Sequence, residues 1–173
     1  TRDKKELENK DVGNWYYEQQ DLGNNYRLTD IQAALGLSQF EKIDWFTKRR
    51  KEIVERYNHS FKEIEGVILQ KNEGYSDTVN HLYVLKLDLP MLKADRKEIF
   101  NALLAENIGV NVHYIPVYLH PYYKKLGYMK GLCPNAEELY DALVTIPLFP
   151  AMTNQDIEDV INGVNKIINY FRK

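Results

Sequence analysis

Apolar residues recur at helical spacing between residues 29 and 62. The stripe consists of Ile31, Leu35, Ile43, Phe46, Val54, Tyr57 and Phe61. Thr29 is followed three residues later by Gln32. This pair matches a capping box, in which the two side chains satisfy free backbone N–H groups at a helix start. The spacing predicts one long connecting helix over 29–62, and a kink near Asp44 is compatible with it.

After Gly66 the pattern changes to alternation, which predicts strands over 66–70 and 80–89. One face of the second strand would carry His81, Tyr83, Leu85, Leu87 and Leu89. A further strand is expected over 110–116, where Pro116 ends it. A short extended piece is expected over 145–150, where Pro147 places it on an edge or against a ligand.

Three more helices are predicted in this part of the chain. The first opens at Asp95 and ends at a left-handed cap, Gly109, and the second runs from Asn135 to about Val144. Thr153 caps a last helix, whose apolar stripe is Ile157, Val160, Ile161, Val164, Ile167, Ile168 and Phe171. The predicted fold class is therefore α+β, a small, largely antiparallel sheet covered on one face by helices.

The pattern divides the chain into three parts around one main core. Residues 1–28 lack a sustained period, and we expect an extended segment and a turn that lie on a surface belonging to something else. Residues 29–62 form the connecting helix, and residues 63–173 form a small α+β domain. A length of 173 residues suffices for one sizeable core.

The composition argues against several classes of function. A formal charge of −2, from 23 basic and 25 acidic residues, gives no electrostatic reason to expect nucleic acid or an anionic membrane as a partner. No apolar run is long enough to span a membrane, and the first ten residues are charged where a signal peptide would be apolar. A single cysteine, Cys133, fits a reducing compartment. We expect a soluble, cytoplasmic protein.

Candidate chemistry is sparse. The four histidines, at positions 59, 81, 113 and 120, show no metal-ligand spacing, so we expect no metal site. The sequence has neither a phosphate-binding glycine loop nor a nucleophile elbow. Thirteen tyrosines are many for this length, and several lie between residues 113 and 128. Tyrosine suits sugars and ring-shaped ligands, although a transition from core to surface explains the cluster more simply.

The stretch GNNYRLTD, residues 23–30, precedes the connecting helix without a spacer. Amide side chains beside a helix N-terminus suit an anion, because free N–H donors and the helix dipole both favour negative charge there. Gly and Asn are also common in simple turns, and the pattern alone favours a turn.

The same stretch begins a longer resemblance. The segment LGNNYRLTDIQAALGLSQFEKIDWFTKRRKEIVERY resembles the one that follows the catalytic core in nucleotide-sugar aminotransferases of the DegT/DnrJ/StrS type. The similarity continues in family order through HLYVLKLD, IGVNVHYIPVYLHPYYKKLGY and TIPLFPAMTNQDIEDVINGVNKII. Within the family the chain looks like the pseudaminic-acid branch, which aminates C4 of a UDP-linked 4-keto-6-deoxy-N-acetylhexosamine, and like spore-coat polysaccharide homologues.

The resemblance implies the small domain of a fold-type I scaffold, a homodimer, pyridoxal 5'-phosphate as cofactor and a nucleotide-sugar substrate. Gly23, Asn25 and Arg27 match the family's G-x-N-x-R element. In that element the Asn is implied to reach the cofactor phosphate of the other subunit, and the Arg to brace the loop.

Substrate contacts are implied by the same resemblance. His113 and Tyr114 match the family's strand that faces the sugar, and Tyr118 and His120 lie in the loop after it.

The resemblance also implies that something is missing. In the family the lysine that carries the cofactor lies upstream of GNNYRLTD on a large domain, in a Ser-rich context. Lys4, Lys5 and Lys10 stand in a charged segment that does not match it. We therefore expect this chain to be the C-terminal portion of such an enzyme. It would hold no catalytic residue and would be inactive alone. The usual amino donor in the family is glutamate. Two alternatives remain, a stand-alone nucleotide-sugar-binding or regulatory module and a dimerisation domain.

Overall fold

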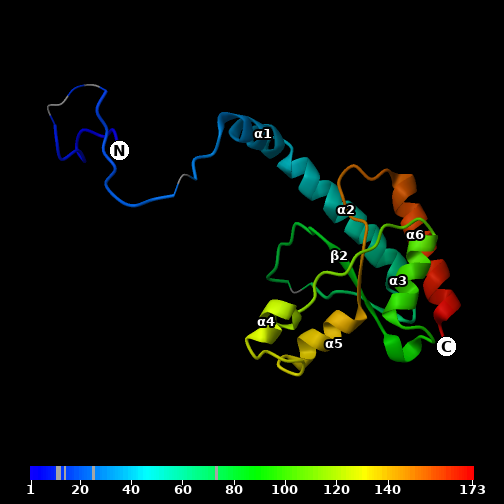
Figure 1. Ribbon diagram of the computed structural model, residues 1–173. Coiled ribbons are helices and arrows are strands. Elements are labelled where there is room, and N and C mark those ends of the chain that lie inside the picture. The colour runs from blue at the N-terminus through cyan, green and yellow to red at the C-terminus, as the bar shows by residue number, and fades with distance from the viewer. Residues whose placement is uncertain (11–12, 14, 25, 73) are drawn as a thin grey trace. The chain divides into compact units, whose positions relative to one another are not determined.

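A computed structural model describes residues 1–10, 13, 15–24, 26–72 and 74–173 (Figure 1). The chain divides into two compact units, Thr1–Glu41 and Lys42–Lys173. The boundary between them lies within the range 29–62.

The N-terminal unit is organised around the carboxylate of Glu18. It accepts hydrogen bonds from the backbone N–H groups of Glu8 and Asn9, each at 2.8 Å, and from the side chain of Gln20. These backbone hydrogen bonds lower the pKa of Glu18 to about 2. The unit ends with α1 (Asp30–Phe40).

The capping box predicted at Thr29 is confirmed. Gln32 N–H donates to the Thr29 hydroxyl oxygen, and Thr29 N–H donates to the Gln32 side chain at 3.0 Å. The predicted single helix, however, is present as two helices, α1 and α2 (Ile43–Phe61). Lys42 leaves the helical conformation, with φ −100° and ψ 0°. The break lies close to Asp44, where the sequence is compatible with a kink, but helical periodicity runs through this point and does not show a full interruption.

The C-terminal unit is built on a three-stranded antiparallel sheet in the order β1-β2-β3. The strands are β1 (Val67–Ile68), β2 (Tyr83–Leu87) and β3 (Leu143–Ile146). In β2 the residues Tyr83, Leu85 and Leu87 are buried and alternate with half-buried Val84 and Lys86. The buried set faces the core, as the alternating pattern predicts.

Helices cover the core face of this sheet, which confirms the predicted α+β class. They are α2, α3 (Arg96–Ala105) and α6 (Asn154–Phe171), and Figure 1 shows them on one side of β2 with α5 (Pro134–Ala142) on the other. Helix α6 is the most strongly amphipathic element. Its buried residues are Ile157, Val160, Ile161, Gly163, Val164, Ile167 and Ile168. The remaining helices are short: η1 (Leu89–Met91), η2 (Val117–Leu119) and α4 (Pro121–Lys125).

Three local predictions differ from the structure. Helix α3 ends at Ala105, and the left-handed residue is Asn107 (φ 60°) instead of Gly109. Ile108 N–H returns to Leu103 C=O at 3.0 Å, which completes a Schellman motif with Asn in the usual place of Gly. Helix α5 begins at Pro134, because proline at the first helical position needs no N–H acceptor. Instead of a strand over 110–116, only Asn111 pairs, with Thr145.

Side chains of α2 fix the segment that joins β3 to α6. The Tyr57 hydroxyl donates to Pro147 C=O at 2.9 Å, and Arg50 donates to Leu148 C=O at 3.0 Å. Arg49 donates to the carbonyl of Met152 at 2.8 Å. Burial raises the pKa of Tyr57, so its hydroxyl keeps the proton that it donates. Helix α2 therefore holds both ends of this connection.

Candidate functional site

Two of the predicted substrate residues, His113 and Tyr114, lie in direct contact. Their rings meet edge to face with centroids 4.5 Å apart. His113 is half-buried, and its Nδ1 lies 3.0 Å from the hydroxyl oxygen of Thr145 on β3. Tyr114 is 70% exposed, so its ring is available to a ligand. Backbone hydrogen bonds between Asn111 and Thr145, of 3.0 and 2.7 Å, anchor the start of this segment to the sheet.

Thr145 belongs to the face of the sheet that looks away from the core. It pairs directly with Val84, whereas its neighbours Val144 and Ile146 pair with the core residues Leu85 and Tyr83. A largely apolar groove of about 410 Å³ lies on the same outer face, lined by Ile68, Leu69, Gln70, Val84, Lys86, Leu139 and Leu143. His113 and the groove therefore share one side of the small domain.

Tyr118 has a different environment. Its hydroxyl donates to Glu137 Oε1 at 2.7 Å, and the same oxygen accepts from Gly131 N–H at 2.7 Å. The hydrogen bond from Tyr118 is the main reason that the pKa of Glu137 lies below its usual range, and the Gly131 amide acts in the same direction. Burial, reinforced by Glu137, raises the pKa of Tyr118 to about 12. The Tyr118 hydroxyl thus ties the loop over 117–133 to α5.

Sequence reasoning missed Glu137, the buried carboxylate of α5 that holds this loop. Its 6% exposure sets it apart from Glu138, which is exposed and pairs with Lys86 at 3.3 Å. The one available signal was its position in the first turn of a helix opened by Pro134. Acidic residues are common there for the helix dipole alone, so the pattern could not indicate a loop contact.

His120, the fourth predicted substrate residue, is exposed at the start of α4. Its carbonyl accepts from Lys124 N–H at 3.0 Å. The exposed rings of Tyr122, Tyr123 and Tyr128 follow it and contact one another edge to face. Of the four predicted substrate residues, all of which the structure describes, only His113 and Tyr114 touch through their rings.

The residues of the predicted cofactor element belong to the N-terminal unit. Asn25 lies outside the described residues. Gly23 and Arg27 are exposed, and a Cβ at Gly23 would meet nothing within 4 Å. Both the backbone at Gly23 and the guanidinium of Arg27 are therefore open to a ligand.

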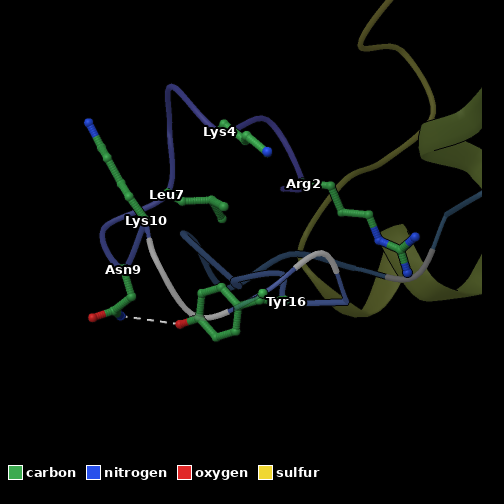
Figure 2. A pocket seen from close by; sticks show the side chains of 7 residues that line it. Arg2, Lys4, Leu7, Asn9, Lys10 and Tyr16 are labelled. Atoms are coloured by element: carbon green, nitrogen blue, oxygen red, sulfur yellow. Dashed lines mark hydrogen bonds between the residues drawn. The ribbon is translucent and has the colours of Figure 1, made fainter.

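A basic hollow of about 290 Å³ lies in the same unit, near its start (Figure 2). Its charged lining residues are Arg2, Lys4 and Lys10, and the Asn9 amide donates to the Tyr16 hydroxyl at its wall, 3.2 Å away. Figure 2 shows the three cationic side chains leaving the segment in different directions. A built anion site would require these side chains to converge on one point, and they do not.

The described part of the chain lacks two structural features. Among the described residues no group of three or more His, Cys, Asp or Glu side chains is arranged to hold a metal ion. Across the same residues, no helix combines the length and the apolar character needed to cross a membrane.

A family model of the DegT/DnrJ/EryC1/StrS aminotransferases matches residues 4–165. The chain belongs to this family. It is 42% identical to the spore coat polysaccharide biosynthesis protein SpsC of Bacillus subtilis over 158 residues, covering 90% of this chain and 41% of the relative. It is 34% identical to the UDP-4-amino-4,6-dideoxy-N-acetyl-beta-L-altrosamine transaminase of Campylobacter jejuni over 160 residues, covering 92% and 42%.

Solved structures of sugar aminotransferases have the same fold. The putative sugar aminotransferase Spr1654 of Streptococcus pneumoniae, in its apo-form, aligns with a TM-score of 0.81 and 26% identity. The alignment covers 92% of this chain and 40% of that one. The same protein is known in PLP and PMP forms. The chain spans about two fifths of the length of the curated relatives that it matches.

Membership of this family makes pyridoxal phosphate the cofactor to test against the residues present. The cofactor supplies an electron sink for amino transfer when it is bound. Its phosphate needs backbone N–H groups and a cation. The open backbone at Gly23 leaves room for such a phosphate, and Arg27, four residues later, carries an exposed guanidinium.

Proposed function

We propose that this chain is the C-terminal part of a pyridoxal-phosphate-dependent nucleotide-sugar aminotransferase. In the whole enzyme an amino group from glutamate replaces the carbonyl oxygen of a UDP-linked 4-keto-6-deoxy sugar, and 2-oxoglutarate is released. The product would serve cell-surface or spore-coat polysaccharide or nonulosonic acid synthesis. The family match over residues 4–165, with relatives of these named activities, carries the proposal.

The site residues divide between two tasks in this proposal. Asn25 and the backbone at Gly23 contact the cofactor phosphate of the partner subunit in a homodimer, and Arg27 braces their turn. His113 and Tyr114 contact the sugar nucleotide. Their paired rings support this role, because an exposed tyrosine beside a fixed imidazole offers one apolar face and polar hydrogen-bonding groups together.

Tyr118 and His120 complete the substrate-facing segment in different ways. Tyr118 shapes the loop through Glu137, and exposed His120 remains free to contact the ligand. The lysine that carries the cofactor belongs to the rest of the enzyme. We therefore propose that the 173 residues alone do not catalyse amino transfer.

The experiment compares the whole enzyme with this chain. The whole enzyme is incubated with glutamate and a UDP-linked 4-keto-6-deoxy-N-acetylhexosamine, and 2-oxoglutarate and the amino sugar are quantified. His113→Ala and Tyr114→Ala should raise KM for the sugar about tenfold or more. His59→Ala, an exposed histidine on α2, is the matched control and should leave KM unchanged.

The chain alone separates the proposal from its alternatives. It should give no product, and added pyridoxal phosphate should keep the absorbance spectrum of free cofactor. Micromolar binding of a UDP-sugar by the chain alone, on the order of 8 kcal/mol, would instead support a stand-alone binding module. Product formed from glutamate by the chain alone would overturn the proposal.

A further inference from the structure

The contact between Thr145 and His113 raises a question about proton position. Thr145 is only 5% exposed, and its hydroxyl oxygen lies 3.0 Å from Nδ1 of His113. A neutral imidazole has one nitrogen that donates and one that accepts. Either the hydroxyl donates to Nδ1, or Nδ1–H donates to the hydroxyl oxygen.

The surroundings of Thr145 favour the first arrangement. Its neighbours in β3 are apolar, and all four residues of the strand are buried. Within the described part of the chain, Nδ1 of His113 is the one hydrogen-bond partner of the Thr145 side chain. If Nδ1–H were the donor, the hydroxyl proton would be left without an acceptor in a dry environment, which costs the full desolvation of that group.

We propose that Thr145 is a positioning residue that fixes His113 as the Nε2–H tautomer, so that the site presents a hydrogen-bond donor to an acceptor oxygen of its ligand. The chemical class of that group is a hydroxyl, carbonyl or phosphate oxygen, all of which a nucleotide sugar carries. The ligand half of this proposal rests on the proposed function, whereas the tautomer half does not.

The backbone makes the arrangement rigid. Asn111 and Thr145 exchange two hydrogen bonds two residues before His113, and β3 is held in register by β2. The ring of His113 is further limited by the edge-to-face contact with Tyr114. A ring held on two sides keeps one nitrogen toward Thr145, and the donor therefore stays on the other nitrogen.

The first measurement is long-range ¹H–¹⁵N correlation spectroscopy on the uniformly labelled 173-residue chain at about pH 8.5, where an ordinary histidine is neutral. Four histidines give four patterns, and His113→Gln assigns the one that disappears. The expected pattern for His113 has an acceptor-type Nδ1 and a protonated Nε2. A protonated Nδ1 in the wild-type chain would overturn the proposal, whatever happens to the variants.

Thr145→Val removes the hydroxyl and keeps the shape of the side chain. It should convert the single tautomer of His113 to a mixture, and Thr145→Ser should restore the single pattern. Retention of the amide hydrogen exchange protection at Asn111 and Thr145 shows that the pairing survives. A single Nε2–H tautomer retained in Thr145→Val would overturn the role of the hydroxyl.

The whole enzyme tests the ligand half. Thr145→Val should raise KM for the sugar nucleotide about five- to twentyfold with little change in kcat, and Thr145→Ser should return KM to within about twofold of wild type. An unchanged KM together with the expected tautomer shift would overturn the donor role. Absence of any aminotransferase activity in the wild-type enzyme would instead overturn the proposed function and leave the tautomer result standing.

Discussion

A close approach between α6 and the turn after α3 allows a quantitative test of the fold. Gly163 is buried in α6, and a Cβ built on it would lie 2.2 Å from Cδ1 and 3.4 Å from Cγ1 of Ile108. Ile108 is itself buried and ends the Schellman motif that directs the chain toward His113. The glycine is therefore required by packing, although its position in a helix interior is unfavourable.

Gly163→Ala combines two opposing effects. Alanine is favoured over glycine by about 1 kcal/mol in a helix interior. Overpacking against Ile108 costs about 1–3 kcal/mol, because Cδ1 must leave its rotamer or the helix must shift. The net result should be a loss of about 0–2 kcal/mol in the free energy of unfolding.

Ile108→Val removes the clashing Cδ1. Alone it should cost about 0.5–1.5 kcal/mol for the lost methyl group. In the double variant the alanine no longer clashes and keeps its helical advantage, so stability should return close to wild type. The coupling free energy between the two sites should equal the overpacking cost, about 1–3 kcal/mol.

The assay is urea unfolding of the 173-residue chain followed by circular dichroism at 222 nm. Gly36→Ala in α1 is the matched control, since a Cβ there would meet nothing within 4 Å. It should not lower stability and should not couple to Ile108→Val. Additive effects of Gly163→Ala and Ile108→Val, within about 0.5 kcal/mol, would refute the packing argument.

Two further predictions concern the loop over 117–133 and helix α1. Glu137→Ala removes the acceptor that holds the loop, so it should speed trypsin cleavage at the exposed residues Lys124, Lys125 and Lys130 several-fold. The control variant Glu138→Ala, at an exposed neighbour, should not change the cleavage rate. Equal rates in the two variants would show that Glu137 does not hold the loop. Helix α1 buries no residue and exposes Leu35 and Leu37, so replacing both by Glu should shift the isolated chain to monomer in sedimentation velocity. The control variant, Ser38→Glu with Gln39→Glu, adds the same charge without removing apolar surface. Dimers that persist in the leucine variant would point to another surface.

The elements that the sequence predicted correctly have strong local signals. The helix starts predicted at Thr29, Asp95 and Thr153 are all confirmed, and each has a capping box. A short polar side chain and an acceptor three residues later satisfy free N–H groups whatever packs above them. The alternation in β2 and the stripe of α6 were also readable, since each buries one face on a single core.

The missed features depend on contacts between distant segments. The break between α1 and α2 lies near Asp44, where a kink is compatible with the sequence, but a helical pattern that is apolar on both sides does not show that the helix is interrupted. The left-handed cap was predicted at Gly109 and is found at Asn107. Both residue types tolerate positive φ, so residue type alone did not distinguish the two positions. Glu137 and Thr145 became candidate site components only when folding brought Tyr118 and His113 to them, across 19 and 32 residues of sequence.

The candidate site depends on the same strand that fills the core. In β3, Val144 and Ile146 belong to the hydrophobic core, and Thr145 between them faces His113 on the outer side of the sheet. Valine has nearly the shape of threonine and would fill a buried position without any need for a partner. Among the described residues, His113 is the group that accepts a hydrogen bond from this buried hydroxyl and so offsets its desolvation. Packing alone therefore gives no reason for threonine here, whereas holding the imidazole in one orientation and one tautomer does.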